Sequence, residues 1–185
     1  MLAVFIGNNL APAAIERWII FHFAFIPAAW FIAEWPIWSK AIAPFTYSLL
    51  HGGFMHLALN GVMLAVMGQV LERLLGRPKF FLIFVAGVVA GALVHSLIGG
   101  AADVPLVGAS AGVGALYGAG VALHGKHVSL GPNSQLLMAL AAFFVITNLL
   151  GLVLPLLSNI AYGAHLGGFI AGILVTASFA GRPRR

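Results

Sequence analysis

The sequence predicts an all-α polytopic membrane protein, and three observations lead to this fold class. Of its 185 residues, 62% are hydrophobic and only 7% are charged, whereas a soluble domain carries about 25% charged residues. Apolar runs long enough to cross a bilayer recur along the chain. No polar linker divides these runs, so we expect a single membrane domain over residues 1–185.

Composition also excludes several kinds of site and partner. The net charge of +5 comes from basic residues at the ends of apolar runs, which is typical of membrane topology and not of nucleic-acid binding. The chain has no cysteine and a single aspartate, Asp103, so a thiolate nucleophile and an aspartyl dyad within one chain are excluded. A His-Glu-x-x-His zinc motif is absent. We therefore expect no metal, no cofactor and no nucleic-acid partner.

The first 50 residues predict a first span and a loop. Leu2–Ile6 is apolar but is followed by Asn8, Asn9 and Pro12, and no basic segment precedes it, so we expect no signal peptide. The aromatic-rich run Trp18–Ile32 either spans the membrane or lies in the interface. We prefer a first span that is short or cut off at the N-terminus, followed by an interfacial loop with short helices.

Residues 51–180 predict five further spans. Glycine and proline interrupt the apolar pattern between them, as at Gly99-Gly100 and Gly131-Pro132. A basic tail, expected to be cytoplasmic, follows at residues 181–185. The predicted spans are Phe54–Leu75, Phe80–Ile98, Gly108–Leu123, Leu136–Leu157 and Ile160–Ala180.

Basic residues predict the orientation of these spans. They cluster at three points, each separated from the next by two spans: Arg73–Lys79, Lys126 and Arg182–Arg185. The positive-inside rule places all three on the cytoplasmic side. The second, fourth and sixth spans therefore begin on the outer side, and these beginnings carry His56 and Asn60, Ser110, and His165. The sixteen residues from Ser110 to Lys126 correspond to about 24 Å of helix, so Ser110 is expected below the outer surface of an about 30 Å core.

Two of these polar residues lie on helix faces made of small residues. Ser110 is followed by glycines four and eight residues later, and His165 by Gly168 and Gly172. Such faces allow membrane helices to approach closely. Packing the two faces together would bring Ser110 and His165 within reach, as a nucleophile and its general base require. The alternative is that Ser110 is only a packing residue, which is the usual role of a lone serine in such a span.

His56 and Asn60 are one helical turn apart and can both donate hydrogen bonds. Together with the backbone N–H of Ser110 they suit an oxyanion hole; the alternative is that Asn60 only bonds across helices. His51, beside Gly52-Gly53, is expected to brace the loop. The only acid in a predicted span is Glu72, at the far end of Phe54–Leu75 from His56 and Asn60. Because no carboxylate is thus expected near the site, the imidazole of His165 would be oriented by packing.

Four motifs, in this order and on alternate spans, resemble the rhomboid family of intramembrane serine proteases over roughly residues 44–180. They are His51-Gly-Gly-Phe-Met-His56-Leu-Ala-Leu-Asn60, Glu72-Arg-Leu-Leu-Gly76, Gly108-Ala-Ser110 and Ala164-His165-Leu-Gly-Gly168-Phe-Ile-Ala-Gly172. The resemblance implies a six-helix bundle, a catalytic Ser110–His165 dyad and an oxyanion hole formed by His56 and Asn60. His51, Gly108, Gly168 and Gly172 would support this site.

The resemblance also implies a class of substrate and a route by which the substrate reaches the site. Peptide bonds in or near transmembrane segments of other proteins would be cleaved, often after small residues. Residues 18–50 would form a membrane-embedded loop. The fifth span, around Ala141–Leu157, and the cap loop Ser158–Gly163 would form the substrate gate. We expect the plasma membrane of a bacterium, with the site facing the outer side; the sequence indicates no oligomeric state.

Two positions depart from the family pattern. The residue after the serine is Ala111, where glycine is usual, and the residue four after it is Gly114, where an aromatic side chain often packs on the histidine. Tyr117 and Tyr162 are the candidates to cover the imidazole instead. A rhomboid-like protein that binds membrane helices without cleaving them is the alternative function. A transporter or channel is disfavoured, since the sequence shows neither internal repeats nor charged residues in the middle of a span.

Overall fold

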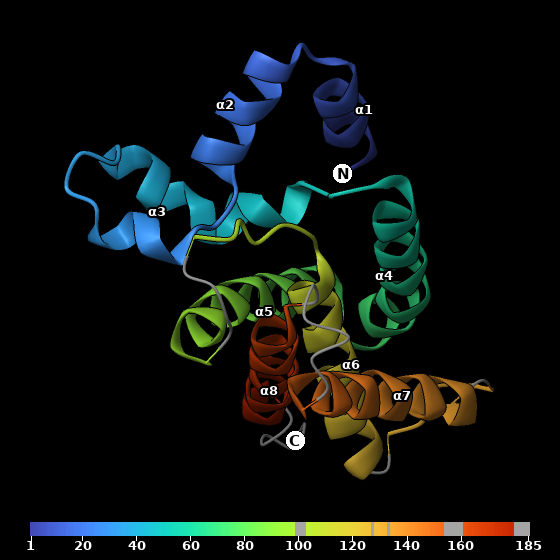
Figure 1. Cartoon of the computed structure of the whole chain (residues 1–185). Coiled ribbons are helices and arrows are strands. Elements are labelled where there is room, and N and C mark those ends of the chain that lie inside the picture. Colours follow the sequence, from blue (N-terminus) through green and yellow to red (C-terminus); the bar gives the residue numbers. More distant parts are fainter. Residues whose placement is uncertain (99–102, 127, 133, 154–160, 180–185) are drawn as a thin grey trace.

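The computed structural model describes residues 1–98, 103–126, 128–132, 134–153 and 161–179, and its regular elements there are all helical (Figure 1). Three predicted parts lie outside the described residues: the tail at 181–185, residues 154–157 at the end of the fifth span, and residues 158–160 of the cap loop. The all-α fold class is confirmed. The elements are α1 (Leu2–Leu10), α2 (Ala13–Phe23), η1 (Pro27–Phe31), α3 (Ile37–Thr46), η2 (Tyr47–Leu49), α4 (Phe54–Leu75), α5 (Arg77–Ile98), α6 (Ser110–Gly125), α7 (Ser134–Val153) and α8 (Tyr162–Phe179).

The first 50 residues form short helices and no long one. Helices α1 and α2 contain 9 and 11 residues, or about 14 and 17 Å, which is less than the about 30 Å of a hydrocarbon core. They are separated at Ala11-Pro12 and project from the rest of the molecule as a V (Figure 1). The run Trp18–Ile32 is broken at Ala24, which is extended, so it does not span as one helix. The short helices η1 and α3 follow, and a position of this loop in the membrane interface stays a prediction.

Within the described part of the chain, four helices are long and apolar enough to cross a membrane: α4, α5, α7 as far as Gly151, and α8. Their bounds lie within a few residues of those predicted, except where glycine or proline decides the start. Gly76 has a φ of +81° and ends α4, and Pro78 is tolerated in the first turn of the next helix. Helix α5 therefore starts at Arg77, so that Arg77 and Lys79 lie inside it and not in a loop.

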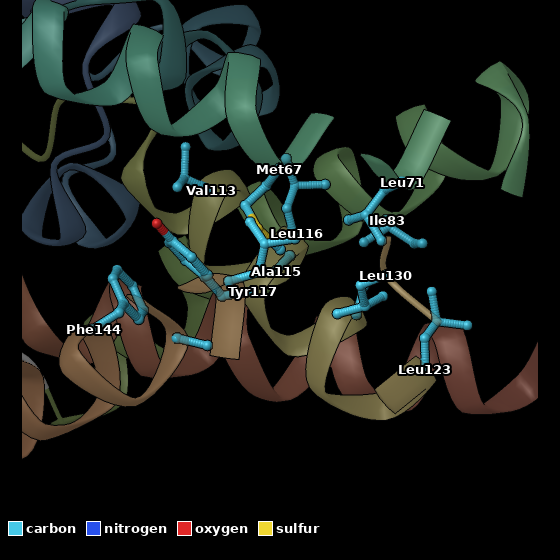
Figure 2. Packing of buried hydrophobic residues seen from close by; sticks show 13 residues of the cluster. Met67, Leu71, Ile83, Val113, Ala115, Leu116, Tyr117, Leu123, Leu130 and Phe144 are labelled. Atoms are coloured by element: carbon cyan, nitrogen blue, oxygen red, sulfur yellow. The ribbon is translucent and has the colours of Figure 1, made fainter. Parts of the chain in front are cut away.

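Helix α6 is the centre of the bundle. It has 16 residues, 11 of them buried, and α4, α5, α7 and α8 all pack against it. A helix that is apolar on every side is either surrounded by other helices or exposed to lipid, and the burial of α6 shows that it is surrounded. Figure 2 shows the resulting cluster, in which Leu116 and Tyr117 of α6 meet Met67 of α4, Ile83 of α5 and Phe144 of α7.

Helices α6 and α8 touch at backbone distance. A Cβ atom at Gly168 would collide with the carbonyl oxygen of Ala111, and one at Gly172 with that of Ala115. A Cβ atom at Gly118 of α6 would in turn collide with a carbonyl oxygen of α8. Small residues on both helices therefore permit an approach that side chains would prevent. This close packing brings the starts of α6 and α8 together.

Two lysine side chains lie at the end of the bundle opposite to the starts of α6 and α8. Lys79, at the start of α5, lies 5.4 Å from the ring centre of Phe179 at the end of α8. The ammonium of Lys126, after α6, lies 3.5 Å from the carbonyl oxygen of Ala177. The start of α5 and the ends of α6 and α8 therefore share one end, as the charge pattern requires. Which side of the membrane this end faces stays a prediction.

Candidate active site

The loop before Ser110 is held by the N-terminal region. Two backbone hydrogen bonds join Phe25 and Leu106, with N···O distances of 3.2 and 2.8 Å. The N–H of Gly108 donates to the carbonyl of Tyr47 at 3.0 Å. Tyr47 is itself buried, and its hydroxyl donates to a carbonyl of α5 at 2.8 Å. Burial raises the pKa of this phenol, so it remains a donor. Residues 25–47 thus fix the position from which α6 starts.

Gly108 allows His56 to lie directly against this loop. Its φ of +114° is in the region that favours glycine. A Cβ atom here would lie 2.6 Å from both Cε1 and Nε2 of His56. The glycine therefore serves two purposes, the backbone turn before α6 and the space for the imidazole of α4.

Ser110 and His165 are in hydrogen-bond contact. The hydroxyl oxygen Oγ of Ser110, the first residue of α6, lies 2.7 Å from Nε2 of His165 in the first turn of α8. Both side chains are partly buried. A serine hydroxyl this close to an imidazole nitrogen can transfer its proton as it attacks a carbonyl.

The other ring nitrogen of His165 also has a polar partner, which the sequence analysis missed. Nδ1 lies 2.6 Å from the side-chain oxygen Oδ1 of Asn148 on α7. Asn148 is only 3% exposed. The expectation that packing alone orients the imidazole is therefore wrong. A strongly polar amide within the apolar run of the fifth span was the available signal, because such a side chain needs a partner.

Phe144, one turn before Asn148, occupies the space beside the imidazole. Its ring centre lies 5.5 Å from that of His165, and Tyr117 stacks on it at 5.3 Å. A Cβ atom at Gly114 would lie 3.1 Å from Cζ of Phe144. An aromatic ring from α7 thus fills the place left open by Gly114, and Tyr117 supports that ring from behind.

The methyl group of Ala111 is accommodated by α5. A Cβ atom at Gly91 would lie 2.5 Å from the Cβ atom of Ala111, so the glycine on α5 leaves room for the alanine on α6. Ala111 is fully buried. The extra methyl group after the serine is thus directed into a helix interface. Each departure from the family pattern is matched by a complementary residue on a neighbouring helix.

The three polar residues around α4 form a second group. The ring centres of His51 and His56 are 5.1 Å apart, and the Nδ2 group of Asn60 donates to the carbonyl of His56 at 2.9 Å. This bond uses one amide hydrogen of Asn60 and leaves the other. His51 lies before α4, and burial, with a smaller contribution from His56, lowers its pKa to about 4. His51 is therefore neutral at physiological pH.

Among the described residues, no three His, Asp or Glu side chains are grouped so that they could hold a metal ion. The polar groups at this site are a hydroxyl, imidazoles and amides. Ser110, His165 and Asn148 are joined by two successive polar contacts. The ring of His56 lies against Gly108, and Asn60 is bonded to the carbonyl of His56.

Comparison with known proteins finds similarity to rhomboid proteins. A family model described as "Rhomboid domain" matches residues 38–182. YdcA of Bacillus subtilis (strain 168) is 31% identical over 145 residues, which is 75% of this chain and 66% of that protein. Rhomboid protease GluP of the same organism is 29% identical over 142 residues, 76% of this chain and 26% of the relative. Rhomboid-related protein 3 of Homo sapiens is 44% identical over 77 residues, 42% of this chain and 19% of the relative. The chain thus spans less than two thirds of each of these relatives.

Proposed function

The chain belongs to the rhomboid family of integral, multi-pass membrane proteins, and from this premise we propose that it is an intramembrane serine endopeptidase. Its substrates are other membrane proteins, which it cleaves in or near their transmembrane segments. The observation that carries the proposal is the 2.7 Å contact between Ser110 Oγ and His165 Nε2. A relative whose name contains "Rhomboid protease" supports it.

The proposed reaction has two steps. Ser110 Oγ attacks the scissile carbonyl carbon while Nε2 of His165 takes the hydroxyl proton, and the same nitrogen then gives that proton to the leaving amine. Water next attacks the acyl-enzyme, again with His165 as general base, and releases the carboxylate and the free serine. Both steps need the same contact, because the imidazole alternates between base and acid.

The negative charge that develops on the carbonyl oxygen requires donors. We assign this role to His56, to the free amide hydrogen of Asn60 and to the backbone N–H of Ser110. The first backbone N–H groups of a helix have no intrahelical partner, and the helix dipole places partial positive charge there. The position of Ser110 at the start of α6 and that of His56 against Gly108 support this assignment.

The site lies at the end of the bundle opposite to Lys79 and Lys126. We propose that this end faces the outside of the plasma membrane of a bacterium, and that α7 is the helix that a substrate must pass. Helix α7 supports this assignment because it covers His165 directly through Phe144 and Asn148.

Purified protein in liposomes tests the proposal. We expect it to cleave members of a panel of single-span proteins within or beside the span, and we expect a fluorophosphonate to label Ser110. The alternative function, binding of membrane helices without hydrolysis, predicts the opposite pattern. Single-span proteins would then co-purify with the chain while Ser110 remained unlabelled and every substrate intact.

Replacing His56 with phenylalanine tests the oxyanion assignment. The ring size is nearly kept while the donor is lost, so kcat should fall about 10²- to 10³-fold, as when one oxyanion donor is removed elsewhere. The rate of cleavage in liposomes measures the effect. His124→Phe, at the exposed far end of α6, is the matched control. An H56F variant with unchanged kcat would remove His56 from the assignment.

A further inference from the structure

We propose that Asn148 is a positioning residue that holds His165 in the tautomer and orientation that proton transfer from Ser110 requires. The role of Asn148 in catalysis rests on the function proposed above, whereas its hydrogen bond to His165 can be tested without measuring catalysis. The observation behind it is the buried contact of 2.6 Å between Asn148 Oδ1 and His165 Nδ1.

The neighbouring helix backbone determines which way the Asn148 amide points. Its nitrogen Nδ2 lies 2.6 Å from the carbonyl oxygen of Phe144. A carbonyl oxygen can only accept a hydrogen bond, so the amide nitrogen must face it. The amide oxygen is then the atom that faces His165, and the amide has no freedom to turn around without losing both bonds.

The direction of the second bond follows from the first. Because Oδ1 of Asn148 can only accept, the hydrogen between it and His165 must be on Nδ1. In the neutral imidazole the lone pair is then on Nε2, which lies 2.7 Å from Ser110 Oγ. The opposite tautomer would place two lone pairs against each other at Nδ1 and would leave Nε2 protonated, with no base facing the serine hydroxyl.

Helix α7 holds the imidazole in a second way. Phe144 and Asn148 are four residues apart and lie on one face of the helix, so the ring of Phe144 packs against His165 while Asn148 binds its edge. Both contacts come from a helix that carries no other part of the proposed reaction. The alignment of the base therefore depends on α7 being docked against α8.

The hydrogen bond is tested first by nitrogen NMR on protein with ¹⁵N-labelled histidine in micelles, with the His165 signals assigned by their loss in His165→Gln. At neutral pH we expect a protonated Nδ1 and an unprotonated Nε2. In Asn148→Leu we expect signals of the tautomer with Nε2 protonated to appear. An Nε2-protonated ring in the unmodified protein, or unchanged signals in N148L, would overturn the proposal.

The rate of cleavage tests the positioning role. N148L should lower kcat about 10- to 100-fold with KM within about twofold of the original, since a misplaced catalytic group costs up to about 10². Asn148→Asp keeps an acceptor for Nδ1 and should retain activity within about tenfold. Asn9→Leu is the matched control and should behave as the original protein. The amide of Asn9 also donates to the carbonyl four residues before it, but Asn9 is exposed on α1.

The two arms separate failure of this proposal from failure of the proposed function. If N148L cleaves at the original rate, as Asn9→Leu should, Asn148 has no positioning role. If the unmodified protein neither cleaves nor is labelled at Ser110, the proposed protease function fails, and the NMR experiment still decides whether Asn148 sets the tautomer of His165. If kcat falls as far in N148D as in N148L, the acceptor for Nδ1 is not what matters, and Asn148 is only a packing residue.

Discussion

Replacing Ser110 with alanine is expected to abolish cleavage of single-span substrates in liposomes. Without the hydroxyl there is no acyl-enzyme, and loss of a serine nucleophile lowers kcat by about 10⁶-fold in a well-studied soluble protease. His165→Ala should lower the rate by a similar factor, because the pair acts as one unit. The double variant should therefore be no slower than either single one. The appearance of the two cleavage fragments, followed for days, would measure the rates of the two single variants and of the double variant.

The matched control is another serine at the opposite end of α8. The hydroxyl of Ser178 donates to a carbonyl of its own helix and is exposed, so Ser178→Ala should cleave at the original rate. Labelling by a fluorophosphonate should follow the same pattern and be lost in S110A only. Cleavage by S110A at a rate comparable with that of S178A would exclude Ser110 as the nucleophile and, with it, the proposed mechanism.

The sequence was sufficient to predict the contact between Ser110 and His165, for a physical reason. Two faces of small residues at helical spacing allow packing at backbone distance, and the glycines facing Ala111 and Ala115 pack in this way. When the two helices pack along these faces, the polar residues at their starts meet. The spacing of the glycines therefore indicates which faces of two membrane helices pack together and in which register.

The contribution of α7 could not be predicted in the same way. Its apolar residues lie on every side, so their periodicity does not indicate which face meets the bundle, and the amide of Asn148 signals only that it needs a partner. Asn148 and Phe144 can be linked to His165 only when the rotation of α7 about its own axis is known. For the same reason Ala111 and Gly114 stood out as departures in the sequence, because their complements, Gly91 and Phe144, lie on other helices.

The first 50 residues were the least predictable part. Prolines and aromatic residues alternate there, and no helical periodicity extends over a span's length. What the sequence could not indicate is that this region reaches the site. The contacts of Phe25 and Tyr47 with the loop before Ser110 join positions more than 60 residues apart, and backbone hydrogen bonds of this kind leave no residue-type signature.

The largest effect on stability is expected from Gly172→Ala. The added methyl group would meet the carbonyl oxygen and carbon of Ala115, which belong to a buried helix backbone that cannot turn aside as a side chain can. Helices α6 and α8 would have to separate along much of their length. Overpacking of a core typically costs about 1–3 kcal/mol, and we expect the upper end or more, measured by reversible unfolding in mixed detergent micelles.

Gly61→Ala provides the comparison that isolates this cause. Gly61 also lies inside a helix, α4, but a Cβ atom there would meet nothing within 4 Å. Alanine is favoured over glycine in helix interiors by about 0.8–1 kcal/mol, so G61A should be as stable as the original protein or slightly more so. The same chemical change thus has opposite signs at the two positions, and the difference measures the backbone contact alone. Equal stability of G172A and G61A would mean that Gly172 does not set the spacing of α6 and α8, and the contact of Ser110 with His165 would then need another explanation.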